Sequence, residues 1–170
     1  ARAAWDTDLI CPVTSAAGRL FDAAAAGICE LPKASFEAQG PMQLESLCRD
    51  RQCGVGCELL ESDGGVLRGD GDPRVDVIGD VSIEPRLRAE IFHASMADAI
   101  VSQAVAARSR HDIEQVGLCG GVFQNRFLTE LAMAGLEDAG FRVHLPQVLP
   151  CNDAALSFGQ AAEAAARGQQ

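Results

Sequence analysis

Apolar residues recur at helical spacing through the second half of the chain. Leu87, Ile91, Met96 and Ile100 predict one long helix that begins at Pro85 and ends near residue 110. Shorter apolar segments follow in the order strand 113–119, helix 125–139, strand 141–145 and helix 153–167. Helices that alternate with strands in this way predict an α/β layer, with the helices covering the faces of a sheet.

The first half of the chain has a weaker pattern, with one Ala-rich run that ends at Ala26. This run has high helix propensity. We expect Thr14 or Ser15 to cap the N-terminus of this helix, and Gly27 to end it. A second helix is expected over Gly40–Arg51, where a proline at the second position suits a first helical turn.

Residues 63–80 are dense in Gly and Asp, which predicts turns. Two short apolar pieces lie in or beside this stretch, at 75–78 and 81–83, and each fits either a strand or a loop. Near the other end, Gly140 follows the predicted helix 125–139 and is expected at its C′ position. The chain shows neither an internal repeat nor a low-complexity linker.

Composition and charge narrow the class of protein. The chain has 170 residues, of which 48% are hydrophobic, so it is long and apolar enough for one packed domain. It lacks an apolar run of about 18 residues, so no membrane span is expected. The first residues read as a cut end of a longer polypeptide. The net charge of −10 repels a phosphate backbone on average, so we expect no nucleic-acid partner.

Cysteine and histidine do not form a recognisable metal motif. The seven cysteines are odd in number and scattered, which is typical of small buried residues in a reducing cytoplasm and predicts a cytoplasmic protein. Cys48, Cys53 and Cys57 cluster, but their spacing differs from that of structural zinc sites, and no histidine is near them in the sequence. His93 and His144 are expected to be packing or surface groups.

The strongest local feature is the step from strand to helix at Gly120, Gly121 and Asn125. Two glycines let the backbone approach a ligand closely, and the next helix presents unpaired N–H groups at its positive end. An ordinary tight turn has the same sequence, so both interpretations stay open. Asp153 likewise fits either a helix cap or a metal ligand, and Asp22 either a solvated helix carboxylate or a site residue.

Five motifs occur in the order found in one known family. Residues 14–23 read T-S-A-A-G-R-L-F-D-A, close to the family's T-S-S-A-G-R-L-F-D-A, and residues 120–125 match G-G-V-F-Q-N in full. Residues 36–45 resemble Y-E-G-Q-A-A-M-x-L-E, Phe92-His93 begins an F-H helix, and residues 152–160 resemble N-D-G-G-x-x-L-G-Q. On these motifs the chain resembles HypF, the carbamoyltransferase family of [NiFe]-hydrogenase maturation.

This resemblance implies an α/β fold of the actin-like/sugar-kinase (ASKHA) superfamily, with a central sheet and flanking helices. Residues 1–170 would be the C-terminal portion of a Kae1-like nucleotide-binding domain whose first lobe is absent from this chain. It also implies that carbamoyl phosphate and ATP yield carbamoyl adenylate. The carbamoyl group then passes to the C-terminal cysteine of HypE, where it becomes a cyanide ligand of the hydrogenase.

The resemblance also assigns roles to residues. Those that would contact adenosine lie in two of the motifs and are Gly18, Asp22, Gly120, Gly121 and Asn125. Asp153 would complete a divalent metal site whose other ligands are histidines of an H-H-x-A-H motif. The physical requirement agrees, because transfer from a mixed anhydride needs positioning and neutralisation of the leaving phosphate.

Departures from the family lead to alternatives. The H-H-x-A-H motif is missing, Ala154 and Ala155 replace two glycines, Ala38 replaces another, and Cys119 replaces the usual serine. The acylphosphatase and zinc-finger regions of the family are also missing. We therefore expect the isolated chain to be inactive. A tRNA threonylcarbamoyl transferase-like enzyme and a non-catalytic docking half-domain remain as alternatives.

Overall fold

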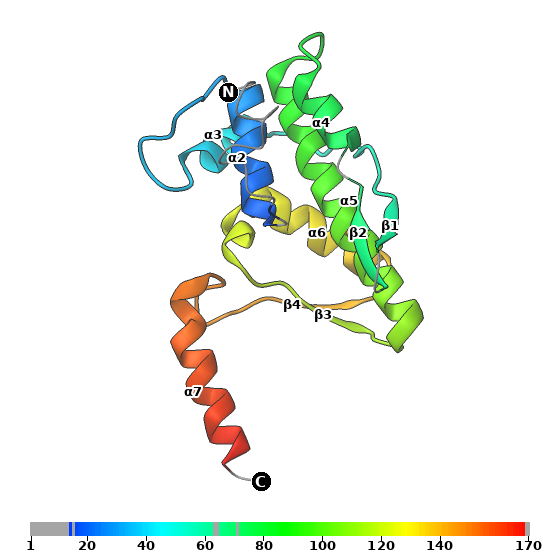
Figure 1. Cartoon of the computed structure of the whole chain (residues 1–170), viewed down its shortest axis with the longest axis vertical. Coiled ribbons are helices and arrows are strands. Elements are labelled where there is room, and N and C mark those ends of the chain that lie inside the picture. The colour runs from blue at the N-terminus through cyan, green and yellow to red at the C-terminus, as the bar shows by residue number, and fades with distance from the viewer. Residues whose placement is uncertain (1–13, 15, 63–64, 71, 169–170) are drawn as a thin grey trace.

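The computed structural model describes residue 14 and residues 16–62, 65–70 and 72–168. Six α-helices and two 3-10 helices are interleaved with four short strands in these ranges (Figure 1). The first elements are α2 (Ala17–Ile28), α3 (Gln39–Leu47), β1 (Leu59–Ser62), β2 (Val66–Gly69) and α4 (Asp72–Gly79). They are followed by α5 (Pro85–His111), β3 (Gln115–Gly117), η1 (Gly121–Gln124), α6 (Arg126–Asp138), β4 (Arg142–His144), η2 (Asp153–Ala155) and α7 (Leu156–Arg167).

The core forms around α5, which has nearly the predicted bounds. Helices α2, α3, α4 and α6 all pack against it (Figure 1). Phe21 of α2 and Phe92 of α5 meet edge to face, with ring centroids 5.1 Å apart and both side chains 1% exposed. Leu128 and Leu136 of α6 are buried in the same cluster. The packing of these distant helices on one another is what holds the first and second halves of the chain together.

Helix α2 differs from its prediction at both ends. The N-cap position is Ala16, which has no side-chain cap bond, and Thr14 Oγ1 instead accepts the Ala16 N–H at 3.1 Å; residue 15 lies outside the described residues. Gly27 does not end the helix, which continues to Ile28. A Cβ at Gly27 would lie 2.6 Å from Ile78 Cγ2, so this glycine serves close packing of α4 rather than helix termination.

Helix α3 ends at Leu47, before the predicted end at residue 51. The cause is a fully buried carboxylate on α5. Glu90 Oε1 accepts the backbone N–H groups of Arg49 at 2.9 Å and Asp50 at 3.1 Å, and Glu90 Oε2 accepts from Gln52 Nε2 at 3.1 Å. These bonds give hydrogen-bond partners both to the buried carboxylate and to the backbone N–H groups that follow the helix. The chain beyond residue 47 therefore forms a loop rather than a further helical turn.

The stretch between α3 and α5 is more regular than predicted. Strands β1 and β2 form an antiparallel hairpin, and residues 75–78 lie in α4 rather than in a strand or loop. Val77 faces the core at 7% exposure whereas Val75 is 61% exposed, so only one side of this short helix is apolar and buried. Arg88 Nη1 donates to the Ile78 carbonyl at 2.9 Å and fixes the end of α4 against α5.

The second half confirms the predicted order of helices and strands. Strands β3 and β4 pair in parallel through the register Gln115↔Arg142 to Gly117↔His144, and α6 connects them. Gly140 has a φ of +83° and follows the end of α6 as predicted. The α/β class is therefore confirmed, although the described residues contribute only two strands to this sheet. Helix α7 projects from the rest of the chain and has no buried residue (Figure 1).

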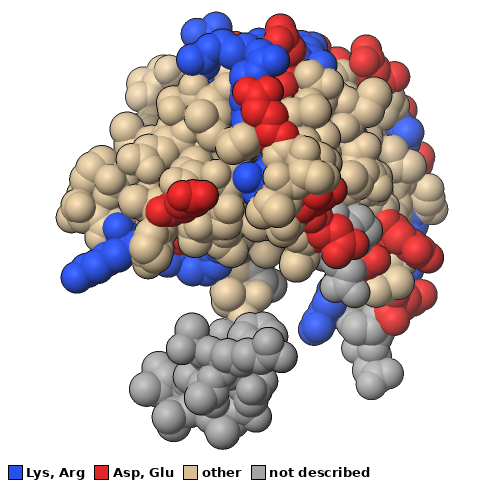
Figure 2. Space-filling model, turned by 90° about the horizontal axis from the view of Figure 1, so that it is seen from above, with Lys and Arg blue, Asp and Glu red and all other residues tan. Residues whose placement is uncertain are grey.

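Charged side chains are unevenly distributed over one face of the molecule. Figure 2 shows one face on which Lys and Arg gather at one edge beside Asp and Glu, while most of the remaining surface is uncharged. None of the helices in the described ranges is long and apolar enough to cross a membrane. The described cysteines, residues 29, 48, 53, 57, 119 and 151, are all free thiols.

Candidate functional site

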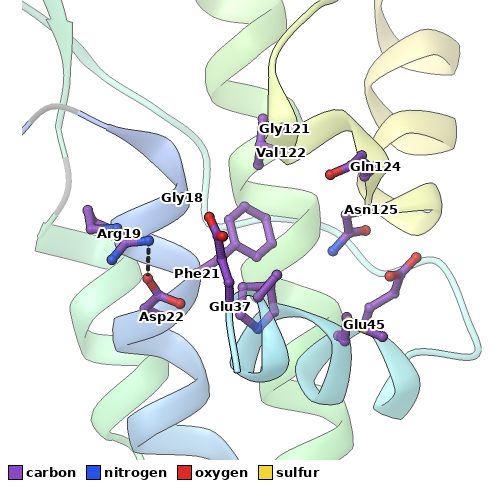
Figure 3. Close-up of a pocket in the computed structure, with 13 residues that line it drawn as sticks. Gly18, Arg19, Phe21, Asp22, Glu37, Glu45, Gly121, Val122, Gln124 and Asn125 are labelled. Carbon is purple, nitrogen blue, oxygen red and sulfur yellow. Dashed lines mark ion pairs between the residues drawn. The ribbon is translucent and has the colours of Figure 1, made fainter. Parts of the chain in front are cut away.

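A pocket of about 590 Å³ opens between α2, α3 and the turn that leads into α6. Gly18 and Asp22 line it from α2, Glu45 from α3, and Gly121 and Asn125 from the turn. Figure 3 shows how these residues, which belong to separate elements, are placed around the pocket. The volume lies within the range of small-molecule and cofactor sites.

The structure brings most of the predicted adenosine residues together. Gly18 and Asp22 are about a hundred residues away in sequence from Gly121 and Asn125, yet all four line the same pocket. Gly120 is not among the lining residues but directly precedes Gly121, which is. Asp153 lies outside the pocket lining.

Gly120 has a φ of +109° and a ψ of 155°, a conformation that is open almost only to glycine. Its N–H donates to the Cys151 carbonyl, and its own carbonyl accepts the Phe123 N–H at 3.1 Å. The first glycine of the pair therefore makes the turn. The second, Gly121, starts η1, and a Cβ there would have no neighbour closer than 4.0 Å. Its missing side chain leaves space in the pocket.

Packing within the protein does not require glycine at position 18. A Cβ at this position of α2 would meet nothing within 4 Å. Glycine in a helix costs up to about 1 kcal/mol relative to alanine. A helical glycine that borders a pocket and has open space where its Cβ would be is consistent with close approach by a ligand. This separates Gly18 from Gly27, which has a packing role.

The positive end of α6 is already occupied by protein groups. Asn125 Oδ1 accepts the Leu128 N–H at 2.8 Å, and Glu45 Oε1 accepts those of Arg126 at 2.7 Å and Phe127 at 3.2 Å. The expectation that this helix presents unpaired N–H groups to a ligand is therefore wrong. A carboxylate from α3 takes the place where a phosphate would bind a free helix N-terminus.

The charged residues that line the pocket also disfavour a phosphate. Asp22, Glu37 and Glu45 line it, and Arg19 is the basic residue among the lining side chains. Arg19 Nη2 lies 2.8 Å from Asp22 Oδ2, an exposed pair drawn as the dashed line in Figure 3. Carboxylates accept hydrogen bonds from hydroxyl and amine groups but repel phosphate oxygens. This part of the pocket suits an uncharged ligand group rich in donors.

Behind the pocket, Asn125 is joined to a buried histidine that sequence reasoning assigned to packing or the surface. Asn125 Nδ2 lies 2.9 Å from His93 Nε2, and His93 is fully buried on α5. The signal that could have identified it is a histidine at the centre of the apolar face of a long helix. Glu45 was also missed as a site residue, because its contact with α6 joins residues 81 apart in sequence.

Asp153 and its neighbours do not by themselves make a metal site. Asp153 is exposed at the start of η2, and Asn152 is the capping residue, since its Oδ1 accepts the Ala154 N–H at 3.1 Å. Among the described residues no group of three His, Cys, Asp or Glu side chains is arranged to hold a metal ion.

Comparison with known proteins places this geometry in a family. Residues 1–160 match the family described as carbamoyltransferase, Kae1-like domain, second subdomain. The chain is 35% identical over 165 residues to a carbamoyltransferase HypF homolog of Cupriavidus necator, covering 92% of this chain and 42% of that protein. It is 36% identical over 158 residues to the carbamoyltransferase HypF of Rhodobacter capsulatus, covering 92% of this chain but 20% of that protein.

Solved structures agree. The crystal structure of full-length HypF in the phosphate- and nucleotide-bound form matches with a TM-score of 0.77 and 34% identity, over 86% of this chain and 20% of that one. HypF of T. kodakarensis shares the fold, with a TM-score of 0.69. The chain thus spans between about a fifth and two fifths of the length of these relatives. It belongs to the HypF carbamoyltransferase family and corresponds to the second subdomain of the family's Kae1-like domain.

Proposed function

We propose that the pocket receives the adenosine part of ATP and of carbamoyl adenylate, and that the chain supplies this wall of a carbamoyltransferase site. The observation that carries the proposal is the convergence of Gly18 and Asp22 from α2 with Gly121 and Asn125 from the turn before α6 around one pocket. Two glycines that lack internal packing partners remove the side chains that would otherwise fill it.

The character of the lining supports adenosine rather than its phosphates as the occupant of this pocket. Met42, Pro41 and Val122 add apolar surface on which a base can pack. The carboxylates of Glu37 and Asp22 are acceptors suited to ribose hydroxyls and to an exocyclic amine. With the α6 N-terminus taken by Glu45, the phosphates would extend out of the pocket rather than toward α6.

The reaction that we propose for the complete protein follows the family. Carbamoyl phosphate is first hydrolysed to carbamate and inorganic phosphate. A carbamate oxygen then attacks the α-phosphorus of ATP and displaces pyrophosphate, which gives carbamoyl adenylate. The thiol sulfur of a HypE-like partner's C-terminal cysteine then attacks the carbamoyl carbon. The new C–S bond replaces the C–O bond to AMP, which leaves with the electron pair while the thiol proton is released. The product is the thiocarboxamide that precedes a cyanide ligand of [NiFe]-hydrogenase. We place this reaction in the cytoplasm.

The metal of the proposed reaction is not assigned to this chain. Asp153 could contribute one oxygen ligand to a divalent ion, but among the described residues it belongs to no group of three His, Cys, Asp or Glu side chains that could hold one. The contribution that we assign to the chain is therefore binding and orientation of the nucleotide. Positioning of this kind can account for a large share of the barrier reduction in group transfer.

Calorimetric titration with ATP and with a carbamoyl-adenylate analogue tests the proposal, and two glycines make a matched pair. Gly18→Ala adds one methyl group to the pocket without any clash inside the protein, whereas Gly159→Ala adds one to exposed α7. Both exchanges replace a helical glycine by alanine, so neither should lower the free energy of unfolding. We expect Gly18→Ala to weaken nucleotide binding and Gly159→Ala to leave it unchanged.

The outcomes separate the competing hypotheses. Loss of affinity in Gly18→Ala with undiminished stability would assign the loss to the pocket rather than to unfolding. Absence of heat with this chain, and again after addition of the family's preceding subdomain, would reject a nucleotide site. That result would instead favour the non-catalytic docking half-domain.

A further inference from the structure

His93 is the most deeply buried titratable side chain beside the pocket, and the proposed function does not yet use it. It is fully buried on α5. Phe21 of α2 and Phe127 of α6 contact its ring edge to face, with centroid distances of 5.2 and 5.5 Å. Its Nδ1 lies 2.7 Å from the Ala89 carbonyl oxygen and 3.4 Å from Cys48 Sγ. Its Nε2 lies 2.9 Å from Asn125 Nδ2.

These contacts fix the tautomer from both ends. A carbonyl oxygen only accepts, so the close approach of Ala89 O requires a proton on His93 Nδ1. At the other end, Leu128 N–H donates to Asn125 Oδ1, which turns the amide nitrogen of Asn125 toward the histidine. An amide nitrogen only donates, so His93 Nε2 must be unprotonated to accept it. Both arguments give the neutral Nδ1–H form.

The remaining neighbour agrees with this assignment. Cys48 Sγ is 3.7 Å from the Leu44 carbonyl, to which its S–H can donate, so the sulfur can accept a weak bond from His93 Nδ1–H. Burial, reinforced by the charges of Glu90 and Glu45, raises the pKa of the Cys48 thiol to about 12. The thiol therefore stays protonated and does not draw a positive charge onto the imidazole.

We propose that His93 is a positioning residue for the nucleotide pocket: its neutral Nδ1–H form holds the Asn125 carboxamide so that one amide N–H faces the ligand. This inference rests on the proposed function of that pocket. One N–H of Asn125 is used by His93, and its oxygen caps α6. Asn125 lines the pocket at 7% exposure and is drawn there in Figure 3. Its second amide N–H is the group left to donate to an acceptor atom of the nucleobase or ribose.

The arrangement makes the pocket sensitive to pH. Protonation of His93 Nε2 would place two donors against each other and break the contact with Asn125. Burial lowers the pKa of His93, while its bond to Ala89 and the charge of Glu45 on α3 act in the opposite direction. Of the other charges nearby, Glu90 on α5 is bonded to the chain after α3, and Arg126 on α6 pairs with Glu130 at the surface. Helix α2 presents an aromatic ring to His93.

The sign of the pH effect follows. Because the pKa of His93 in the folded chain lies below its ordinary value near 6.5, the neutral form is favoured by folding. The Asn125 contact is complete above about pH 6.5 and is lost as the pH falls through the lower folded pKa. Nucleotide affinity should decrease over the same interval.

Two measurements on the full chain test the proposal, and the first needs no ligand. Long-range ¹H–¹⁵N NMR at pH 7.5 should show His93 as the neutral Nδ1–H tautomer. An Nε2–H tautomer would overturn the inference even if nucleotide binding were confirmed. Conversely, a correct tautomer together with no binding of ATP at any pH would reject the proposed function of the pocket and, with it, the positioning role.

The second measurement is the ATP dissociation constant between pH 5 and 8 for the wild type, His93→Gln and His93→Leu. Glutamine can present an uncharged oxygen to Asn125 near the position of Nε2, whereas leucine fills the volume without an acceptor. We expect the wild type to bind ATP more weakly at low pH and His93→Gln to bind it independently of pH. His93→Leu should bind ATP roughly tenfold more weakly at all pH values, which corresponds to the loss of about one hydrogen bond. Equal affinities of wild type and His93→Leu at pH 7.5, or an unchanged pH profile in His93→Gln, would overturn it.

Discussion

The contact between Glu45 and the N-terminus of α6 can be tested by removing first its charge and then the whole carboxyl group. Glu45 Oε1 accepts one short bond from Arg126 N–H at 2.7 Å and one longer bond from Phe127 N–H at 3.2 Å. A hydrogen bond to a charged group contributes about 1.5–3 kcal/mol, and a carboxylate at a helix N-terminus about 0.3–1 kcal/mol. Glu45 is half-buried, so water can replace part of both effects.

We therefore expect Glu45→Ala to lower the free energy of unfolding by about 2 kcal/mol. Glu45→Gln keeps an acceptor oxygen but loses the charge, so about 0.5–1 kcal/mol is expected. Urea unfolding followed by circular dichroism measures both values, provided that the slope m is unchanged. Glu130→Gln is the matched control, because Glu130 is exposed and paired with Arg126 on the surface of the same helix. It should change stability by less than about 0.5 kcal/mol.

A second readout follows from the vacated helix end. Without the carboxylate, the N–H groups of Arg126 and Phe127 become available to a solvent anion. Sulfate should therefore stabilise Glu45→Ala more than it stabilises the wild type, measured as the shift in unfolding midpoint with sulfate at constant ionic strength. If Glu45→Ala and the Glu130 control were equally stable, and sulfate did not distinguish them, the carboxylate would not be acting as the cap of α6.

Three further predictions follow from single positions. Leu136→Ala, which empties a fully buried site in α6, should cost about 2–5 kcal/mol in urea unfolding, and a loss below about 1 kcal/mol would contradict its place in the core. Gly135→Ala should lower the free energy of unfolding by about 1 kcal/mol, because the added Cβ would lie 2.9 Å from Val101 Cγ2. This effect should outweigh the better helix propensity of alanine. A more stable variant would show that α5 and α6 are farther apart. Asp153→Ala should change stability by less than about 0.5 kcal/mol, since Asn152 is the capping residue. It should lower bound metal per chain when measured in the complete domain, and unchanged metal content would remove Asp153 from the metal site.

The parts of the fold that the sequence predicted are those with local causes. Helix α5 has a sustained apolar spacing and Pro85 at its first turn, and the structure begins and ends it within a residue or two of the prediction. Gly140 ends α6 by a local left-handed conformation. The errors at Gly27 and at the end of α3 both come from residues far away in sequence. Ile78 makes Gly27 a packing position, and Glu90 captures the chain after Leu47.

The candidate site divides in the same way. A resemblance of motifs brought Gly18, Asp22, Gly121 and Asn125 forward, and the structure places all four around one pocket. The motifs could not reveal that Glu45 fills the helix end, because that contact depends on how α3 docks beside α6. The contacts of Gly18, Asp22, Gly121 and Asn125 with adenosine stay a prediction until nucleotide binding is measured.

The two walls of the pocket also have a consequence for folding kinetics. One wall lies in residues 18–45 and the other in residues 121–125, and the bond from Glu45 to Arg126 closes a loop of 81 residues. Closing so long a loop has a large entropic cost, so local helices should form before these walls meet. The pocket should be among the last features to assemble and among the first to open in native-state hydrogen exchange. A nucleotide that bridges both walls would then slow this opening far more than it slows exchange within α5.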